Sequence, residues 1–166
     1  LSPFALMQEI RQWFDGPLAL SGSIATGASV LAAQAMGADL AYIGSAFIAT
    51  EEANADPRYK QAIVESSAED IVYSSLFTGV HGNYLRRSIE LAGMDPDNLP
   101  EGDPSQMDFG EKPDLGGAKA WKDIWGSGQG IGAVKETLPA AKAVERLQRE
   151  YAAAWDRLQG QVAPKG

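Results

Sequence analysis

Two runs of sequence decide the fold of this chain: Pro17-Leu18-Ala19-Leu20-Ser21-Gly22-Ser23 and Leu40-Ala41-Tyr42-Ile43-Gly44-Ser45. Each run is short, almost wholly apolar and ends in small residues, which is typical of a strand covered on both faces in a parallel sheet. The Ala-rich stretch between them starts at a capping residue, Thr26, and ends at Gly37, so it is expected to be a helix. The order strand, helix, strand predicts an α/β fold with two parallel neighbouring strands.

The flanking segments add more helices. Ser2 and Pro3 begin an amphipathic helix with one buried stripe (Phe4, Met7, Ile10 and Phe14), and Asp56-Pro57 begins another that runs to about Glu65. Residues 71–77 are expected to be extended, and residues 83–92 and 118–125 to be helical. The chain ends in a long helix whose apolar stripe is expected to pack on the outside of the domain: Leu138, Ala141, Val144, Leu147, Tyr151, Trp155 and Leu158.

We expect one domain in three parts. Residues 1–93 hold the strands and their helices, and residues 118–166 hold a glycine cluster and the last helix. Residues 94–117 carry four prolines and seven acidic residues, which predicts a surface excursion or lid, with a linker as the alternative.

The overall charge argues against several kinds of partner. With 14 Lys and Arg against 22 Asp and Glu, the net charge is −8, so neither nucleic acid nor an anionic membrane is an expected partner. No apolar run reaches the roughly 20 residues that cross a bilayer, and a cytoplasmic location is expected. Without cysteine and with one histidine, the chain has no pattern for a disulfide or a metal site.

The two strand ends predict a ligand site. In a parallel α/β sheet, Ser21-Gly22-Ser23 and Gly44-Ser45 lie at the same rim, where ligands bind. Small residues let backbone N–H groups approach an anion, and the helix after each turn adds its positive end. This pattern predicts a phosphate cradle. The alternative is that the glycines only permit tight turns.

Two other features are weaker site candidates. The cluster from Gly126 to Gly132 contains a formal dinucleotide-binding pattern, but no strand precedes it, so a loop closing over a ligand with Gln129 as an amide donor is favoured over that pattern. A plain connector is the alternative. His81 is the sole imidazole available as a base, although a histidine beside glycine is more often a loop residue.

At these residues the sequence resembles the nitronate monooxygenase family, formerly called 2-nitropropane dioxygenases. Ser21 to Gly27 resembles the family's turn after its seventh strand, and Ile43 to Phe47 resembles the turn after its eighth strand. Between them, Ala35 to Asp39 resembles the family's Leu-Gly-Ala-Asp motif. Trp125-Gly126-Ser127-Gly128-Gln129-Gly130 is similar to a motif near its C-terminus. The resemblance runs from about Pro3 to Tyr151. It departs at Ser23, which replaces a glycine, at Ser45, which replaces a threonine, and at Ala46, which replaces an arginine.

The resemblance implies an FMN-binding (β/α)8 TIM barrel, of which this chain is the C-terminal part with a helical extension. It implies that the FMN phosphate lies between the two turns, on Gly22, Ser23, Gly44 and Ser45. Tyr42 and Ile43 would lie along the cofactor, and Gln129 near the isoalloxazine or the substrate. The family's base histidine is expected upstream of this chain, so the resemblance assigns no catalytic residue here, and His81 does not match it.

The implied activity is FMN-dependent oxidation of alkyl nitronates with O2 to a carbonyl compound and nitrite. Two alternatives stay open. One is a related FMN-dependent reductase acting on enoyl thioesters or on quinones with NAD(P)H, and the other is a non-catalytic barrel half that binds phosphate. The implied partners are a small nitronate and O2, together with the N-terminal half of the barrel or further copies of the chain.

Overall fold

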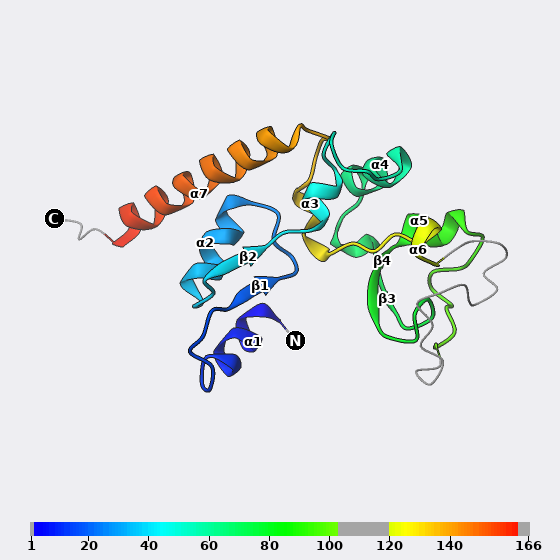
Figure 1. Cartoon of the computed structure of the whole chain (residues 1–166), viewed down its shortest axis with the longest axis horizontal. Helices are drawn as coiled ribbons and strands as arrows, with labels where there is room; N and C mark the ends of the chain where they lie inside the picture. The colour runs from blue at the N-terminus through cyan, green and yellow to red at the C-terminus, as the bar shows by residue number, and fades with distance from the viewer. Residues whose placement is uncertain (1, 103–119, 163–166) are drawn as a thin grey trace.

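The computed structural model describes residues 2–102 and 120–162, in which helices and short strands alternate (Figure 1). In chain order the elements are α1 (Pro3–Ile10), β1 (Ala19–Ser21), α2 (Gly27–Ala35), β2 (Leu40–Tyr42), α3 (Ser45–Ile48), α4 (Pro57–Glu65), η1 (Ala68–Asp70), β3 (Ile71–Ser74), β4 (Gly82–Leu85), α5 (Arg86–Leu91), α6 (Ala120–Asp123), η3 (Gln129–Ala133) and α7 (Ala140–Val162). The α/β class is confirmed.

The parallel pair of β1 and β2 positions the candidate site. Its register sets Leu20 beside Ala41. Asp39, just before β2, fixes this register because its carboxylate accepts hydrogen bonds of 2.8 Å from the Leu18 N–H and from the Arg11 guanidinium. These two bonds, the one from Leu18 first, hold the pKa of Asp39 below its usual range. The predicted parallel neighbours are confirmed.

The two faces of this sheet differ sharply. Leu20 is 5% exposed and packs with Met7 of α1 and Ala33 of α2. On the other face Leu40 is 63% and Tyr42 67% exposed. Parallel strands are normally covered on both faces. Within the described ranges no third strand pairs with β1 or β2, so both sheet edges and one apolar face are uncovered.

Local capping signals place the starts of two helices correctly. The Ser2 hydroxyl accepts a hydrogen bond from the Ala5 N–H at 3.3 Å and begins α1. The Asp56 carboxylate accepts one from the Arg58 N–H at 2.8 Å and begins α4. The Arg58 side chain also donates to this carboxylate and, with that backbone bond, lowers the pKa of Asp56 to about 2. The stripe on α1 is only partly buried, because Phe4 is 62% exposed.

The prediction of one helix over residues 83–92 is wrong in its first part. Residues 82–85 form strand β4, which pairs antiparallel with β3, and the helix α5 begins only at Arg86. The Leu85 N–H donates to the Trp125 carbonyl at 2.8 Å, and the Ser127 N–H donates to the Asn83 carbonyl at 3.1 Å. Partners on both sides therefore hold this segment extended.

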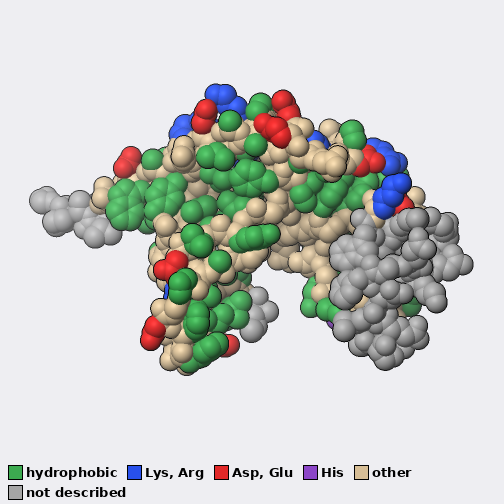
Figure 2. Space-filling view, in the orientation of Figure 1, with side chains coloured by type: hydrophobic (Ala, Val, Ile, Leu, Met, Phe, Trp, Pro, Cys, Tyr) green, Lys and Arg blue, Asp and Glu red, His purple; other side chains and the backbone are tan. Residues whose placement is uncertain are grey.

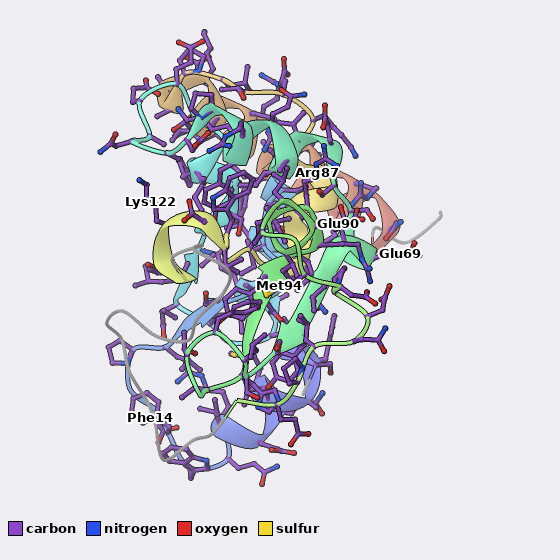
Figure 3. All side chains as sticks on the ribbon, turned by 90° about the vertical axis from the view of Figure 1, so that its right-hand side faces the viewer. Phe14, Glu69, Arg87, Glu90, Met94 and Lys122 are labelled. Carbon is purple, nitrogen blue, oxygen red and sulfur yellow. The ribbon has the colours of Figure 1, made fainter. Side chains whose placement is uncertain are left out.

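The extended segment predicted over residues 71–77 is shorter in the structure. Strand β3 ends at Ser74, whose hydroxyl accepts a hydrogen bond from the Leu76 N–H at 3.1 Å. The Gly79 N–H then donates to the Ser75 carbonyl at 2.8 Å, which closes a turn. Figure 3 views this region with Arg87 and Glu90 of α5, Met94 after it and Lys122 of α6 labelled.

The proposed lid falls mostly outside the described residues. Of residues 94–117, the structure describes 94–102, where Met94 and Leu99 pack against the cluster that holds Phe77. The Gly102 N–H donates to the Ser75 hydroxyl at 3.0 Å. The helix predicted over 118–125 is described from Ala120 and ends at Asp123, so Trp125 follows the helix instead of belonging to it.

The long helix α7 packs on α2, with its apolar stripe turned from the predicted direction (Figure 1). Ala143 and Ala154 are its buried residues, whereas Val144, Trp155 and Leu158 are each more than 40% exposed. Contact with α2 explains this rotation. A Cβ added at Gly27 would lie 2.1 Å from the Leu147 carbonyl oxygen, so the two backbones touch there.

Figure 2 shows the molecule hollowed between the part that carries α1 and β1 and the part that carries β3 and β4. In Figure 1, β2 leads into α3, and the chain after β1 curves back to α2. None of the helices in residues 2–102 and 120–162 combines the length and the hydropathy of a membrane span.

We predict that Gly27→Ala separates α7 from α2, because the new methyl group would lie 2.1 Å from the Leu147 oxygen and 2.2 Å from the Tyr151 nitrogen. Such overpacking costs about 1 to 3 kcal/mol. Gly160→Ala is the matched control, since a Cβ there meets nothing within 4 Å and replaces a helical glycine. Thermal unfolding should show a loss for the first variant and no loss for the second. Equal stability of the two variants would contradict the packing described here.

Candidate functional site

A small pocket lies where β1 and β2 end. Its volume is about 150 Å³. Three segments line it, namely the turn after β1, the turn after β2 and part of the glycine cluster: Ser21, Gly22, Ser23, Ile24, Ala25, Tyr42, Gly44, Ser45, Ala46, Gly128 and Gly130. The two strand-end turns predicted to share one rim therefore do meet.

The first wall is a turn in the left-handed region of backbone space. Gly22 has φ 90° and Ser23 has φ 58°. Glycine adopts such angles freely, but for serine the cost is about 1 to 2 kcal/mol. A Cβ at Gly22 would meet nothing within 4 Å, so this turn presents bare backbone to open space. Strain of this kind is concentrated at functional sites.

The second wall begins at Gly44. A Cβ added there would also meet nothing within 4 Å, so the backbone is open to the pocket. Ser45 starts the short helix α3, and its hydroxyl accepts a hydrogen bond from the Gly128 N–H at 2.9 Å. One hydroxyl group thus joins the second wall to the third.

The third wall is the glycine cluster. A Cβ at Gly130 would lie 2.8 Å from the Ser23 carbonyl carbon and 3.0 Å from its oxygen, so this wall rests directly on the strained turn. At Gly128 an added Cβ would still lie 3.7 Å from the Ser45 hydroxyl. The cluster is therefore part of the pocket, and η3 begins within it at Gln129.

Tyr59 of α4 holds the start of this third wall. Its ring stacks on Trp125, with the ring centroids 5.1 Å apart and the planes 13° from parallel. Its hydroxyl donates a hydrogen bond to the Gly126 carbonyl. Burial raises the pKa of Tyr59 to about 12, so the phenol keeps its proton and its role as donor at neutral pH.

Among the residues that the structure describes, those lining the pocket carry no charged side chain. The N-terminus of α2, which was expected to face an anion in the pocket, already has a partner, because the Gly27 N–H donates to the Glu150 carboxylate at 2.8 Å. Any anion in this pocket would therefore be held by backbone N–H groups and hydroxyls of the turns.

The structure brings five of the seven predicted cofactor residues into the pocket lining: Gly22, Ser23, Tyr42, Gly44 and Ser45. Ile43 instead packs against two clusters of buried residues, and Gln129 is exposed, between two lining glycines. The role of these residues in binding a cofactor remains a prediction.

His81 lies away from the pocket lining. It is exposed in the connection between β3 and β4 and stacks on Tyr73, with ring centroids 4.8 Å apart. Ile24, Ala25, Gly128 and Gly130 line the pocket but were not named individually as site residues, although the cluster from Gly126 to Gly132 was expected to close over a ligand. The sequence signal for Gly128 and Gly130 was that a single residue separates the two glycines. Such a segment has little side chain, so its backbone can approach another backbone segment closely.

These features define the class: an α/β protein with a small, uncharged pocket at the carboxyl ends of neighbouring parallel strands. The chain belongs to the nitronate monooxygenase family, because the model of that family matches residues 2–150. A nitronate monooxygenase of Paraburkholderia phytofirmans is 30% identical over 155 residues, covering 90% of this chain and 42% of that protein.

Solved structures agree on the fold. A nitroalkane oxidase of Streptomyces ansochromogenes matches with a TM-score of 0.72 at 26% identity, over 95% of this chain and 46% of that one. FabK of Thermotoga maritima matches with a TM-score of 0.70 at 22% identity, over 98% and 52%. The chain thus spans about half the length of the proteins that it matches.

We predict that Gly130→Ala opens the pocket, because its methyl group would push the Ser23 backbone away. The expected loss of stability is about 1 to 3 kcal/mol. Gly132→Ala is the control, since its Cβ would lie 3.7 Å from the nearest atom, in ordinary contact, and should change stability by at most roughly 0.5 kcal/mol. Thermal unfolding of both variants measures the difference. A Gly130→Ala protein as stable as the control would contradict the close approach of the third wall.

Proposed function

We propose that the intact protein is an FMN-dependent oxidoreductase that converts alkyl nitronates and O2 into carbonyl compounds and nitrite, and that this chain supplies the FMN phosphate site. The observation that carries the proposal is the pocket between the turns after β1 and β2, in a chain of the nitronate monooxygenase family. The relatives that support this activity are a nitronate monooxygenase and a nitroalkane oxidase.

The size of the pocket supports a phosphate group. Pockets that enclose a whole drug-sized molecule measure roughly 300 to 1,000 Å³. A volume of about 150 Å³ suits only a head group, with the rest of the ligand outside. The open space beside Gly22 and Gly44 is where the backbone of both turns can come within hydrogen-bonding distance of such a group. The residues present therefore fit the phosphate end of FMN.

The chain's own residues bind and orient the cofactor in this proposal. The backbones of Gly22, Ser23, Gly44 and Ser45 hold the phosphate, and Tyr42 lies beside the cofactor. Gln129 is proposed to lie near the isoalloxazine or the substrate. The flavin, when bound, supplies the redox chemistry that protein side chains lack. We propose that the base histidine lies in the part of the intact protein that this chain does not include.

The uncovered sheet supports the barrel proposed for the whole protein. Leu40 and Tyr42 leave an apolar face in solvent, and β1 and β2 each have an open edge within the described ranges. Parallel strands are stable when they are covered on both faces and their edges are paired. We propose that strands from the N-terminal half of the family's fold cover this face and close a (β/α)8 barrel.

The proposed phosphate site is tested by Gly44→Asp. The variant should lose FMN, because it places a carboxylate against the cofactor phosphate, with a loss of more than about tenfold in affinity. Gly44→Asn is the matched control, since it has nearly the same size and no charge. The measurement is the flavin content of protein purified from its native source, by visible absorption. Undiminished FMN in Gly44→Asp would refute the site.

The proposed reaction is tested with two kinds of electron donor, a nitronate and the reduced nicotinamides. Under anaerobic conditions, a nitronate should bleach the flavin absorption of the native protein, whereas NADH and NADPH should leave it almost unchanged. Rapid bleaching by a nicotinamide with none by the nitronate would favour the related reductase instead. A colourless protein of normal fold would sink both oxidoreductase proposals and favour the phosphate-binding alternative.

A further inference from the structure

Two side chains of helix α7 form hydrogen bonds with backbone atoms of the segment that follows β1. The Arg146 Nη2 atom donates a hydrogen bond to the Ala25 carbonyl at 3.2 Å. One helical turn further along, the Glu150 Oε2 atom accepts a hydrogen bond from the Gly27 N–H at 2.8 Å. These bonds bracket Thr26, the cap of α2, and Ala25 itself lines the pocket. The back of the first pocket wall is therefore fastened to α7.

Arg146 and Glu150 also pair with each other. The Arg146 Nε atom lies 3.6 Å from the Glu150 Oε1 atom, and the side chains are 17% and 33% exposed. The two side chains form an ion pair without a hydrogen bond between them, since within the described residues the Arg146 Nε atom is buried without a hydrogen-bond partner. Each side chain is held in place by its own charge-assisted hydrogen bond to the backbone. We call this pair of side chains the clasp, because Arg146 binds the Ala25 carbonyl and Glu150 binds the Gly27 N–H.

The clasp changes how the pocket can bind an anion. At the start of α2 the Gly27 N–H donates to Glu150 and the Ser29 N–H donates to the Thr26 hydroxyl, so two of the N–H groups of this helix end already have partners. Binding of an anion then depends more on the direction in which the turn presents its own N–H groups. Ser23 in this turn has φ 58°, a conformation that persists only where the surroundings impose it.

We infer that Arg146 and Glu150 are positioning residues for the cofactor phosphate, acting through the Ala25 carbonyl and the Gly27 N–H. They touch neither cofactor nor substrate. The inference rests on the proposed FMN site. It goes beyond that proposal because it makes the affinity of the pocket for phosphate depend on two charged side chains that lie more than 120 positions further along the chain.

The test compares FMN with riboflavin, which lacks the phosphate group, on the native flavoprotein after removal of its flavin. Glu150→Ala should lower the affinity for FMN about tenfold, which corresponds to the loss of one hydrogen bond to a charged group. The affinity for riboflavin should stay unchanged. Glu150→Gln keeps an oxygen that can accept from Gly27 and should restore most of the affinity. Glu145→Ala is the matched control, because Glu145 forms an exposed ion pair with Lys142 on the same helix.

Two outcomes would overturn the inference. If Glu150→Ala lowered the affinity for FMN and for riboflavin equally, the clasp would contribute only to the overall stability of the protein. Tighter FMN binding in both Glu150 variants would mean that the carboxylate merely repels the phosphate.

The variant Arg146→Lys and a measurement of amide hydrogen exchange without ligand keep the inference testable if Glu150→Ala fails to fold or FMN does not bind. Arg146→Lys keeps the charge, but one ammonium cannot hold the Ala25 carbonyl and the Glu150 carboxylate with the same fork, so a smaller phosphate-specific loss is expected. If Glu150→Ala does not fold, this variant decides. Amide hydrogen exchange over residues 21–27 should become faster in the clasp variants and not in Glu145→Ala. If the unaltered protein binds no FMN, the proposed function fails and the exchange rates alone decide whether the clasp orders the turn.

Discussion

Parallel pairing of β1 with β2 is the constraint on which the rest of the structure depends. It sets the turns at residues 21–25 and 42–46 side by side, because parallel strands deliver their carboxyl ends to one rim. Asp39 fixes the register with bonds to Leu18 and Arg11, so a slip would break a charged network as well as the ladder. The pocket follows from this register, since small residues stand at both ends.

The C-terminal part of the chain then completes the pocket from two directions. On the pocket side, Gly128 lies against Ser45, and Gly130 lies against the turn at Ser23. The Tyr59 hydroxyl holds the start of this glycine segment at Gly126. From behind, α7 lies against α2 at Gly27. The turn itself contributes little rigidity of its own, because a strained backbone needs neighbours to keep it in place.

Local signals in the sequence predicted much of this fold. Ser2, Thr26 and Asp56 cap helices where expected, because a cap depends on atoms within a few residues. Residues 83–85 were mispredicted as helix because their partners, Val72 and Trp125 among them, lie outside the local sequence. The buried face of α7 was mispredicted for a similar reason. Its apolar residues suggested one stripe, whereas contact with Gly27 and the Arg146–Glu150 pair selected another.

The same distinction holds at the candidate site. The small residues after each strand indicated the two turns, but nothing local indicated that Glu150 would occupy the start of α2. That contact has a consequence for the order of assembly. Gly27 and Ala25 find their partners 123 and 121 positions later, so during synthesis the first turn leaves the ribosome long before α7 exists. The turn after β1 therefore gains these two hydrogen bonds only after α7 has been made and has packed on α2.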